Sequence, residues 1–158
     1  MNKMYQDKDG RYHAGIVTFT PPNDLKIIDD SELNAVYCFS IENKEHDFSI
    51  RTEICYSREN AKAYLEAALD DDEIEPLGEI TPFSVNGLSG YYLDCFFPML
   101  ESVRREFYFD IPDKEYNFFS VFILTNNEKN LRYALQSETI VNFFKTLQLE
   151  AKKRRGRF

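Results

Sequence analysis

Apolar and polar side chains alternate along the first clearly patterned part of the chain. From Phe48 to Tyr56, apolar residues at 48, 50, 54 and 56 alternate with less apolar ones, which is the period of a strand with one buried face. A second apolar run at 35–41 precedes it, and the polar segment 42–47 lies between them. The pattern predicts a hairpin whose other face is at least partly in contact with water.

Two segments show the spacing of amphipathic helices. After Ser57, apolar residues fall at 61, 64, 65, 68 and 69, which predicts a helix of about three turns with Ser57 as its N-cap. Nearer the C-terminus, a short helical turn is predicted at 131–135. Ser137 is then placed to cap a helix with apolar residues at 140, 143, 144 and 147.

Between these helices the pattern returns to strands. Four segments, 79–85, 88–97, 102–111 and 116–125, are separated by short polar loops, which predicts an antiparallel meander. Residues 118–124 are apolar on both faces, so the sheet is expected to be a middle layer covered on both sides. Shorter extended pieces are predicted at 15–20 and 25–28, the second followed by a loop or a single helical turn.

The segment NGLSGYY, residues 86–92, has the glycine spacing of a possible phosphate loop or nucleophile site. A phosphate loop leads into a helix, but a strand pattern follows here. Asn86–Gly87 is instead the preferred pair for a type I′ hairpin turn. The turn predicts pairing of 85 with 88 down to 82 with 91, and it sets Gly90 opposite Phe83, whose ring can cover the bare glycine backbone. Pro82 predicts that 79–85 is an edge strand or ends its outer pairing there.

The size and composition fit one domain. The chain has 158 residues, 43% of them apolar and 15% aromatic, with 14 Phe and no Trp, so a single core rich in phenyl rings is expected. We expect one α+β domain over residues 1–151 and a basic tail over 152–158.

The charge is unevenly distributed. The net charge is −8, but five of the 19 basic residues lie in the tail, so residues 1–151 carry 14 basic and 27 acidic residues, or −13. An acidic body disfavours nucleic acid and lipid headgroups and favours a basic protein partner. The tail is either a basic arm for an acidic partner or a solvated chain end.

No catalytic signature is present. His13 and His46 are expected to be solvated surface residues, and the three cysteines, 38, 55 and 95, have no zinc-site spacing and are expected to be reduced and buried. Asp7–Gly10 lacks the later glutamate of a calcium loop and fits a plain turn. Neither a catalytic residue, a cofactor-binding residue nor a metal ligand is predicted. A carboxylate pair for glycoside chemistry and an aromatic-lined ligand pocket stay open as alternatives.

The N-terminal segment has no apolar core of a signal peptide, and no stretch approaches the roughly 18 apolar residues of a membrane span. A cytoplasmic protein without a membrane span is therefore expected.

The order of elements resembles the PsbP-like superfamily. The resemblance rests on a hairpin, a helix beginning at Ser57, a meander opened by the NGLSG turn, and a closing helix at 137–147 that leads into Leu147-Gln-Leu149. It covers residues 15–149. That superfamily includes the PsbP extrinsic subunit of photosystem II, a nuclear-import factor that binds the Ran GTPase, and bacterial DcrB-type proteins. The resemblance implies an α/β/α sandwich, used as a binding surface without a reaction, and a bacterial chain of this type. It carries over no binding-site residue.

The sequence thus predicts a non-enzymatic protein-interaction or assembly module with another protein as its partner. An acidic chaperone of the secretion type is one alternative, and such chaperones usually bind as dimers through apolar patches. A small-ligand-binding protein, or an enzyme without a recognisable motif, is the alternative from another class.

Overall fold

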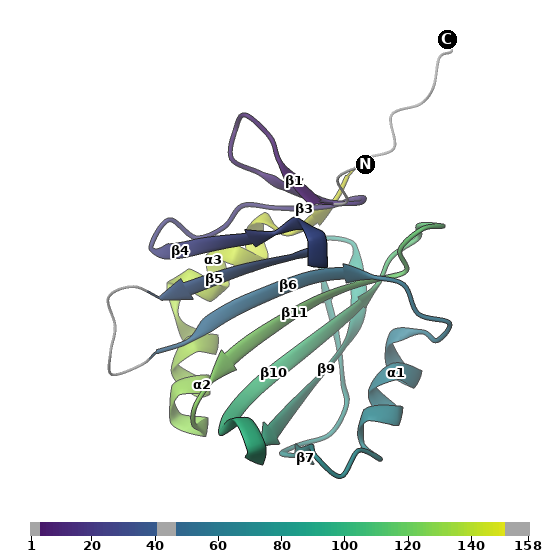
Figure 1. Ribbon diagram of the computed structural model, residues 1–158, viewed down its shortest axis with the longest axis vertical. Helices are drawn as coiled ribbons and strands as arrows, with labels where there is room; N and C mark the ends of the chain where they lie inside the picture. The colour runs from purple at the N-terminus through teal and green to yellow at the C-terminus, as the bar shows by residue number, and fades with distance from the viewer. Residues whose placement is uncertain (1–3, 41–46, 151–158) are drawn as a thin grey trace.

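The computed structural model describes residues 4–40 and 47–150, which form two antiparallel sheets and three α-helices (Figure 1). The larger sheet has the order β4-β5-β6-β11-β10-β9, and both β7 and β8 pair with the outer side of β9. Its strands are β4 (Leu25–Asp30), β5 (Ala35–Ser40), β6 (Ser49–Cys55), β7 (Glu75–Pro76), β8 (Thr81–Val85), β9 (Leu88–Phe97), β10 (Ser102–Asp110) and β11 (Phe118–Thr125). The smaller sheet has the order β1 (Met4–Gln6), β2 (Tyr12–Ala14), β3 (Val17–Phe19) and β12 (Gln148–Leu149).

The helices are α1 (Ala61–Ala68), α2 (Glu128–Gln136) and α3 (Glu138–Thr146), with two short 3₁₀ turns, η1 (Ser31–Leu33) and η2 (Pro98–Leu100). The predicted pairing of β5 with β6 and the meander β8-β9-β10-β11 are confirmed. An α+β class with a mostly antiparallel sheet is therefore confirmed. The connection 41–46 of the β5–β6 hairpin and the tail 151–158 lie outside the described residues.

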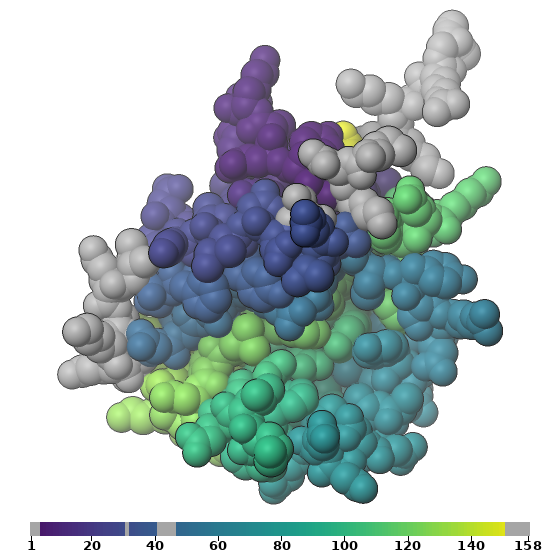
Figure 2. Space-filling view, in the orientation of Figure 1, coloured from purple at the N-terminus to yellow at the C-terminus, as the bar shows by residue number. Residues whose placement is uncertain are grey.

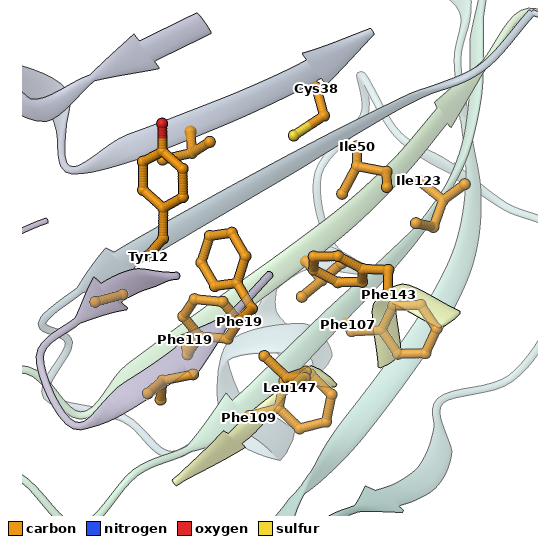
Figure 3. Close-up of a cluster of buried hydrophobic side chains, with 14 of the residues drawn as sticks. Tyr12, Phe19, Cys38, Ile50, Phe107, Phe109, Phe119, Ile123, Phe143 and Leu147 are labelled. Atoms are coloured by element: carbon orange, nitrogen blue, oxygen red, sulfur yellow. The ribbon is translucent and has the colours of Figure 1, made fainter. Parts of the chain in front are cut away.

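One face of the larger sheet, here called the back face, carries the main core (Figure 3). Phe107 and Phe109 of β10 and Phe119 of β11 are buried there. The smaller sheet and α3 supply the opposing side chains: the ring of Phe19 lies 6.0 Å from that of Phe119 and 5.6 Å from that of Phe143. Aromatic pairs at these separations add to the stability that burial itself provides. Most of the phenylalanine side chains of this phenylalanine-rich chain therefore pack in this back-face core.

The opposite face, here called the front face, is covered in part by α1. Ala61 and Leu65 of the helix pack with a small buried cluster from the sheet, made of Leu93, Tyr108, Phe118 and Phe122. Seven of the eight residues of β11 are buried and Leu124 is half-buried. The prediction that this strand is covered on both faces is confirmed.

Strand β6 shows the predicted alternation. Ile50, Thr52 and Ile54 are buried, whereas Arg51 and Glu53 are half-buried. The expectation that Tyr56 belongs to the apolar face is wrong: β6 ends at residue 55 and the Tyr56 side chain is exposed.

The β8–β9 hairpin has the register that the Asn-Gly turn predicts. Val85 pairs with Leu88, Phe83 with Gly90 and Pro82 with Tyr91. Asn86 and Gly87 have φ of 49° and 85°, the positive values that a type I′ turn needs, and β8 pairs with β9 alone. The turn and the edge position are confirmed.

Strand β10, which pairs with β9 on the side opposite β8, leaves no room for a side chain at Gly90. A Cβ atom placed on it would lie 1.9 Å from the carbonyl oxygen of Tyr108 in β10. The close approach of two backbones therefore explains this glycine, whereas the ring of Phe83 packs with those of Phe107, Phe109 and Phe144.

The helix limits differ from the predicted ones at two places. The N-cap of α1 is Asn60, whose side chain accepts the Ala63 N–H, and the helix has only eight residues. Ser57 as the cap is wrong because its backbone is held outside the helix by Asn117, through hydrogen bonds of 2.7 Å to its N–H and its carbonyl. The helical turn expected at 131–135 is the nine-residue α2, capped by Asn127. Ser137 caps α3 as predicted.

The smaller sheet was predicted only in part. The strand expected at 15–20 corresponds to β3, and the piece at 25–28 is part of β4, followed by η1. Strand β12, however, pairs with β3 from more than a hundred residues away, and the Glu150 N–H donates to the Ile16 carbonyl. This pairing brings the two ends of the described chain together (Figure 1).

Candidate functional site

The register of the larger sheet places charged residues side by side on the front face. Across four strands, one row runs Tyr37, Arg51, Phe122 and Glu106. Arg104 and Tyr108 lie two positions before and after Glu106 on β10, so their side chains share this face. Burying a charge on a sheet face costs free energy unless the charge is paired.

Glu106 and Arg104 form an ion pair that is shielded from water. Each residue is 8% exposed, and the Arg104 Nη1 atom lies 3.5 Å from the Glu106 Oε2 atom. The Tyr108 hydroxyl donates to Glu106 Oε1 at 3.1 Å. Burial raises the pKa of the Glu106 carboxyl, and the nearby Arg104 opposes this only in part. Burial, together with Glu106, also raises the pKa of Tyr108, so its hydroxyl keeps its proton and remains a donor.

Both arginines of this face lie against aromatic rings. The guanidinium carbon of Arg104 is 4.0 Å from the centre of the Phe97 ring. That of Arg51 is 5.1 Å from the Tyr37 ring, and Arg51 also donates to Glu53. Such contacts favour a cation over an aromatic face. The Nε atoms of Arg51 and Arg104 are nevertheless buried without a hydrogen-bond partner, so neither guanidinium is fully satisfied.

A pocket of about 590 Å³ opens between α1 and the strands β9 and β10. Arg104, Glu106 and Tyr108 line it from the sheet. The remaining lining residues come from α1, its two flanking loops and the end of β9: Ser57, Glu59, Tyr64, Ala67, Ala68, Asp71, Ile74 and Phe97. We call it the α1 pocket. It joins a buried ionic group to aromatic and aliphatic walls, which is the usual make-up of a ligand pocket.

A second hollow, of about 380 Å³, lies on the front face beyond the reach of α1. Its apolar lining residues are Phe39, Phe48, Leu100 and Leu124, and its charged lining residues are the two acids Asp47 and Glu101. Uncharged polar residues complete the lining: Ser40, Ser49, Ser102, Thr125 and Asn126. We call it the apolar hollow. Figure 2 shows this face, with the atoms around η2 standing out below strands β5 and β6 and those of α1 to their right. The side chains of Met99 and Leu100 in η2 are 85% and 67% exposed.

The three cysteines are free thiols, as expected. Cys38 and Cys95 are buried, and Cys55 is half-buried rather than fully buried. Burial raises the pKa of Cys38 and Cys95 to about 12 and that of Cys55 to about 11. At neutral pH these groups are thiols, which are poor nucleophiles.

His13 is not the solvated surface residue that the sequence suggested. Its side chain is 14% exposed, because its ring stacks on that of Tyr5 at 4.6 Å and its Nε2 atom lies 2.8 Å from Asp7 Oδ2. Asp7 also accepts the N–H groups of Asp9 and Arg11, and with Gly10 at φ 88° it forms the plain turn that was predicted. His46 lies outside the described residues.

Within residues 4–40 and 47–150, no group of three His, Cys, Asp or Glu side chains is arranged to hold a metal ion. None of the residues of the α1 pocket was predicted from the sequence to be a functional residue. The available signal was weak: Arg104 and Glu106 belong to the charged run Arg104–Glu106 at the start of a strand that continues with aromatic residues. Which side of the sheet they face and which residues surround them follow only from the strand pairing.

Comparison with known protein families and with curated proteins found no match to this chain. Among the helices in the described part of the chain, none is long and apolar enough to cross a membrane. The site must therefore be interpreted from its own geometry.

Proposed function

We propose that the chain is a non-enzymatic interaction module that binds a basic segment of another protein on the part of its front face that α1 leaves uncovered. The observation that carries the proposal is the apolar hollow, with Phe39, Leu100 and Leu124 around it and the exposed η2 beside it. Exposed apolar patches rimmed by polar residues are typical of protein-binding surfaces.

Charge selects the kind of partner. The two charged residues that line the hollow, Asp47 and Glu101, are acidic, and residues 1–151 carry a net charge of −13. A segment with an apolar side chain flanked by lysine or arginine complements both features, and opposite charge speeds association. We expect binding to weaken as salt is raised, because exposed charges are screened.

The arrangement of layers supports a family proposal. Helix α1 packs on the front face of the antiparallel sheet. Helix α2 packs on the opposite, back face, where it contacts strands β10 and β11. We accordingly propose that this chain has the PsbP-like α/β/α sandwich fold. Members of the PsbP-like superfamily are mostly binding or assembly proteins. A cytoplasmic location and a bacterial origin remain predictions.

The test is affinity capture from an extract of the native cell, with the purified chain immobilised. We expect the wild type to capture a protein that the double variant Phe39→Ser/Leu100→Ser loses. Val141→Ser is the control, because Val141 on α3 is an apolar residue whose exposure is close to that of Phe39. Circular dichroism establishes that all variants are folded. Retention of the same protein by the folded double variant would refute the proposal.

Deleting residues 152–158 in parallel tests the basic tail. If the truncated chain captures the same protein, the tail is not the arm that holds it. Light scattering after gel filtration tests the chaperone alternative, since a stable monomer counts against a chaperone that works as a dimer.

A further inference from the structure

We propose that the chain forms a two-fold dimer in which the edge strand β4 pairs antiparallel with β4 of a second copy, with Ile28 of one copy opposite Ile28 of the other. The contact lies at the edge of the larger sheet, so it is separate from the apolar hollow and does not depend on the protein-binding proposal. It rests on an open sheet edge, on backbone groups that point outward and on a self-complementary order of charges.

The first observation is that the two edges of the larger sheet differ (Figure 1). Beyond β9 lie the two-residue β7 and the strand β8, and each contains a proline. Short strands and prolines protect an edge from pairing with another chain. At the other edge, β4 has six residues without proline or glycine, and among the described strands it pairs with β5 alone. Ile27 and Ile28 point to opposite faces and are 37% and 46% exposed, so the smaller sheet closes neither side of this edge.

The second observation is the direction of the backbone groups of β4. The Ser40 N–H donates to the Phe48 carbonyl, so the even-numbered residues of β5 bond toward β6. Hydrogen-bonded positions alternate along an antiparallel strand, so the odd-numbered residues of β5 bond toward β4. Their partners in β4 are Lys26, Ile28 and Asp30. The N–H and C=O groups of Ile27 and Asp29 therefore point outward, where no described strand pairs with them.

The third observation is the order of charges along β4. A two-fold axis between antiparallel strands keeps the two front faces together, so residues directly opposite each other come from the same face. Lys26, Ile28 and Asp30 lie on the front face. With Ile28 at the axis, Lys26 of each copy lies opposite Asp30 of the other, and opposite charges at such positions stabilise a sheet. An axis at Ile27 removes both pairs, because Lys26 then lies opposite Ile28.

The side chains of this edge favour a second copy over a foreign strand. Lys26 forms no ion pair with another described residue, and Asp30 accepts only the exposed Leu33 N–H, through one carboxylate oxygen. A basic strand from another protein sets a base near Lys26, whereas the chain's own β4 sets an acid there. Each copy carries a net charge of −8, but this long-range repulsion is screened at physiological ionic strength more than the contact between opposed side chains.

Sedimentation velocity of the full chain tests the dimer from about 10 µM to about 1 mM, because a small interface associates weakly. Lys26→Glu and Asp30→Lys each set like charges opposite one another, and each is expected to weaken self-association about tenfold or more. Mixing the two variants restores opposite charges at both positions, so the mixture is expected to dimerise about as well as the wild type. Lys62→Glu, at an exposed base on α1, is the matched control and should leave the dimer unchanged.

Amide hydrogen exchange locates the contact. The Ile27 and Asp29 N–H groups are expected to exchange more slowly as the chain concentration rises, whereas the Ile28 N–H, already bonded to β5, changes less. Leu100→Ser, in the apolar hollow, is expected to leave the dimer intact.

Three results overturn the proposal. A wild-type chain that stays monomeric over the whole concentration range leaves the edge to a strand of another protein. A mixture of Lys26→Glu and Asp30→Lys that dimerises no better than either variant alone excludes the proposed register. A dimer that Leu100→Ser dissociates and Lys26→Glu does not is formed through the apolar hollow instead.

Discussion

The front and back faces of the larger sheet are built from the same strands yet differ in composition. On β10, Phe107 and Phe109 point into the back-face core, whereas Arg104 and Glu106, which precede them in the strand, point to the front. The back face is closed by the smaller sheet, α2 and α3, whereas α1 covers only part of the front. The back face therefore contributes most of the buried core, and the front face, where we propose that a partner binds, carries the partly exposed rings and the Arg104–Glu106 pair.

The largest effect is expected from a matched pair of phenylalanine truncations. Phe119→Ala opens a cavity in the back-face core, where the ring is fully buried, and is expected to lower the free energy of unfolding by about 3–5 kcal/mol. Phe39→Ala on the front removes a ring that is 39% exposed and should cost about 1 kcal/mol or less. Urea unfolding measures both. Equal losses would contradict the division between the faces.

Gly90→Ala tests the contact between β9 and β10 that aligns both faces. The added methyl group would meet the Tyr108 carbonyl oxygen, and the backbones must separate, so we expect a loss of about 3 kcal/mol. Ser89→Ala, at the exposed neighbouring position, is the control and should leave stability nearly unchanged. A Gly90→Ala chain as stable as the wild type would show that the strands shift at little cost.

Asn86 joins the edge hairpin to the end of α3. Its side-chain amide donates to the carbonyls of Phe144 and Leu147 at 3.1 and 2.7 Å. Asn86→Gly keeps the positive φ and removes these bonds, so a loss of about 1 kcal/mol is expected. Asn86→Ala also strains the turn and should lose more. Thermal unfolding of the two variants separates the stability that comes from the turn conformation from the stability that comes from the hydrogen bonds. An equal loss of stability in both variants would assign the whole effect to the hydrogen bonds.

The smallest and most specific effect concerns pH. Burial raises the pKa of Glu106 above its ordinary value of 4.5. The folded state therefore holds this proton more tightly than the unfolded state, and stability is lost as pH rises from 4.5 through the raised pKa. Glu106→Gln removes this loss, so the stability difference between variant and wild type should shift in favour of the variant over that range. Urea unfolding at a series of pH values tests it, and a difference independent of pH would show that the pKa of Glu106 is not raised.

Local patterns predicted much of the fold. Alternation placed β6, and the Asn-Gly pair fixed the register of β8 and β9, because both depend on neighbouring residues. The cap of α1 was misplaced because Ser57 and Asn60 are both good caps, and the contact that decides between them comes from the distant Asn117. The pairing of β12 with β3 depends on a similarly distant contact, so it was missed.

The candidate site was less predictable than the fold. Arg104 and Glu106 lie in a run of three charged residues that includes Arg105, and the sequence does not say which of the three face the same side of the sheet or which neighbours cover them. The α1 pocket exists because the two-turn helix α1 covers only part of the front face. The apolar hollow exists because η2 approaches strands β5 and β11. Both are set by strand pairing and loop packing, which short patterns do not encode.

The most direct test of the front face as the binding surface is an NMR titration of the ¹⁵N-labelled chain with its captured partner. We expect shifted amide signals to cluster around Phe39, Leu100 and Leu124, with the back-face helix α3 unaffected. Shifts confined to α3 and the β8 edge would contradict the division of the sheet into a structural face and a binding face.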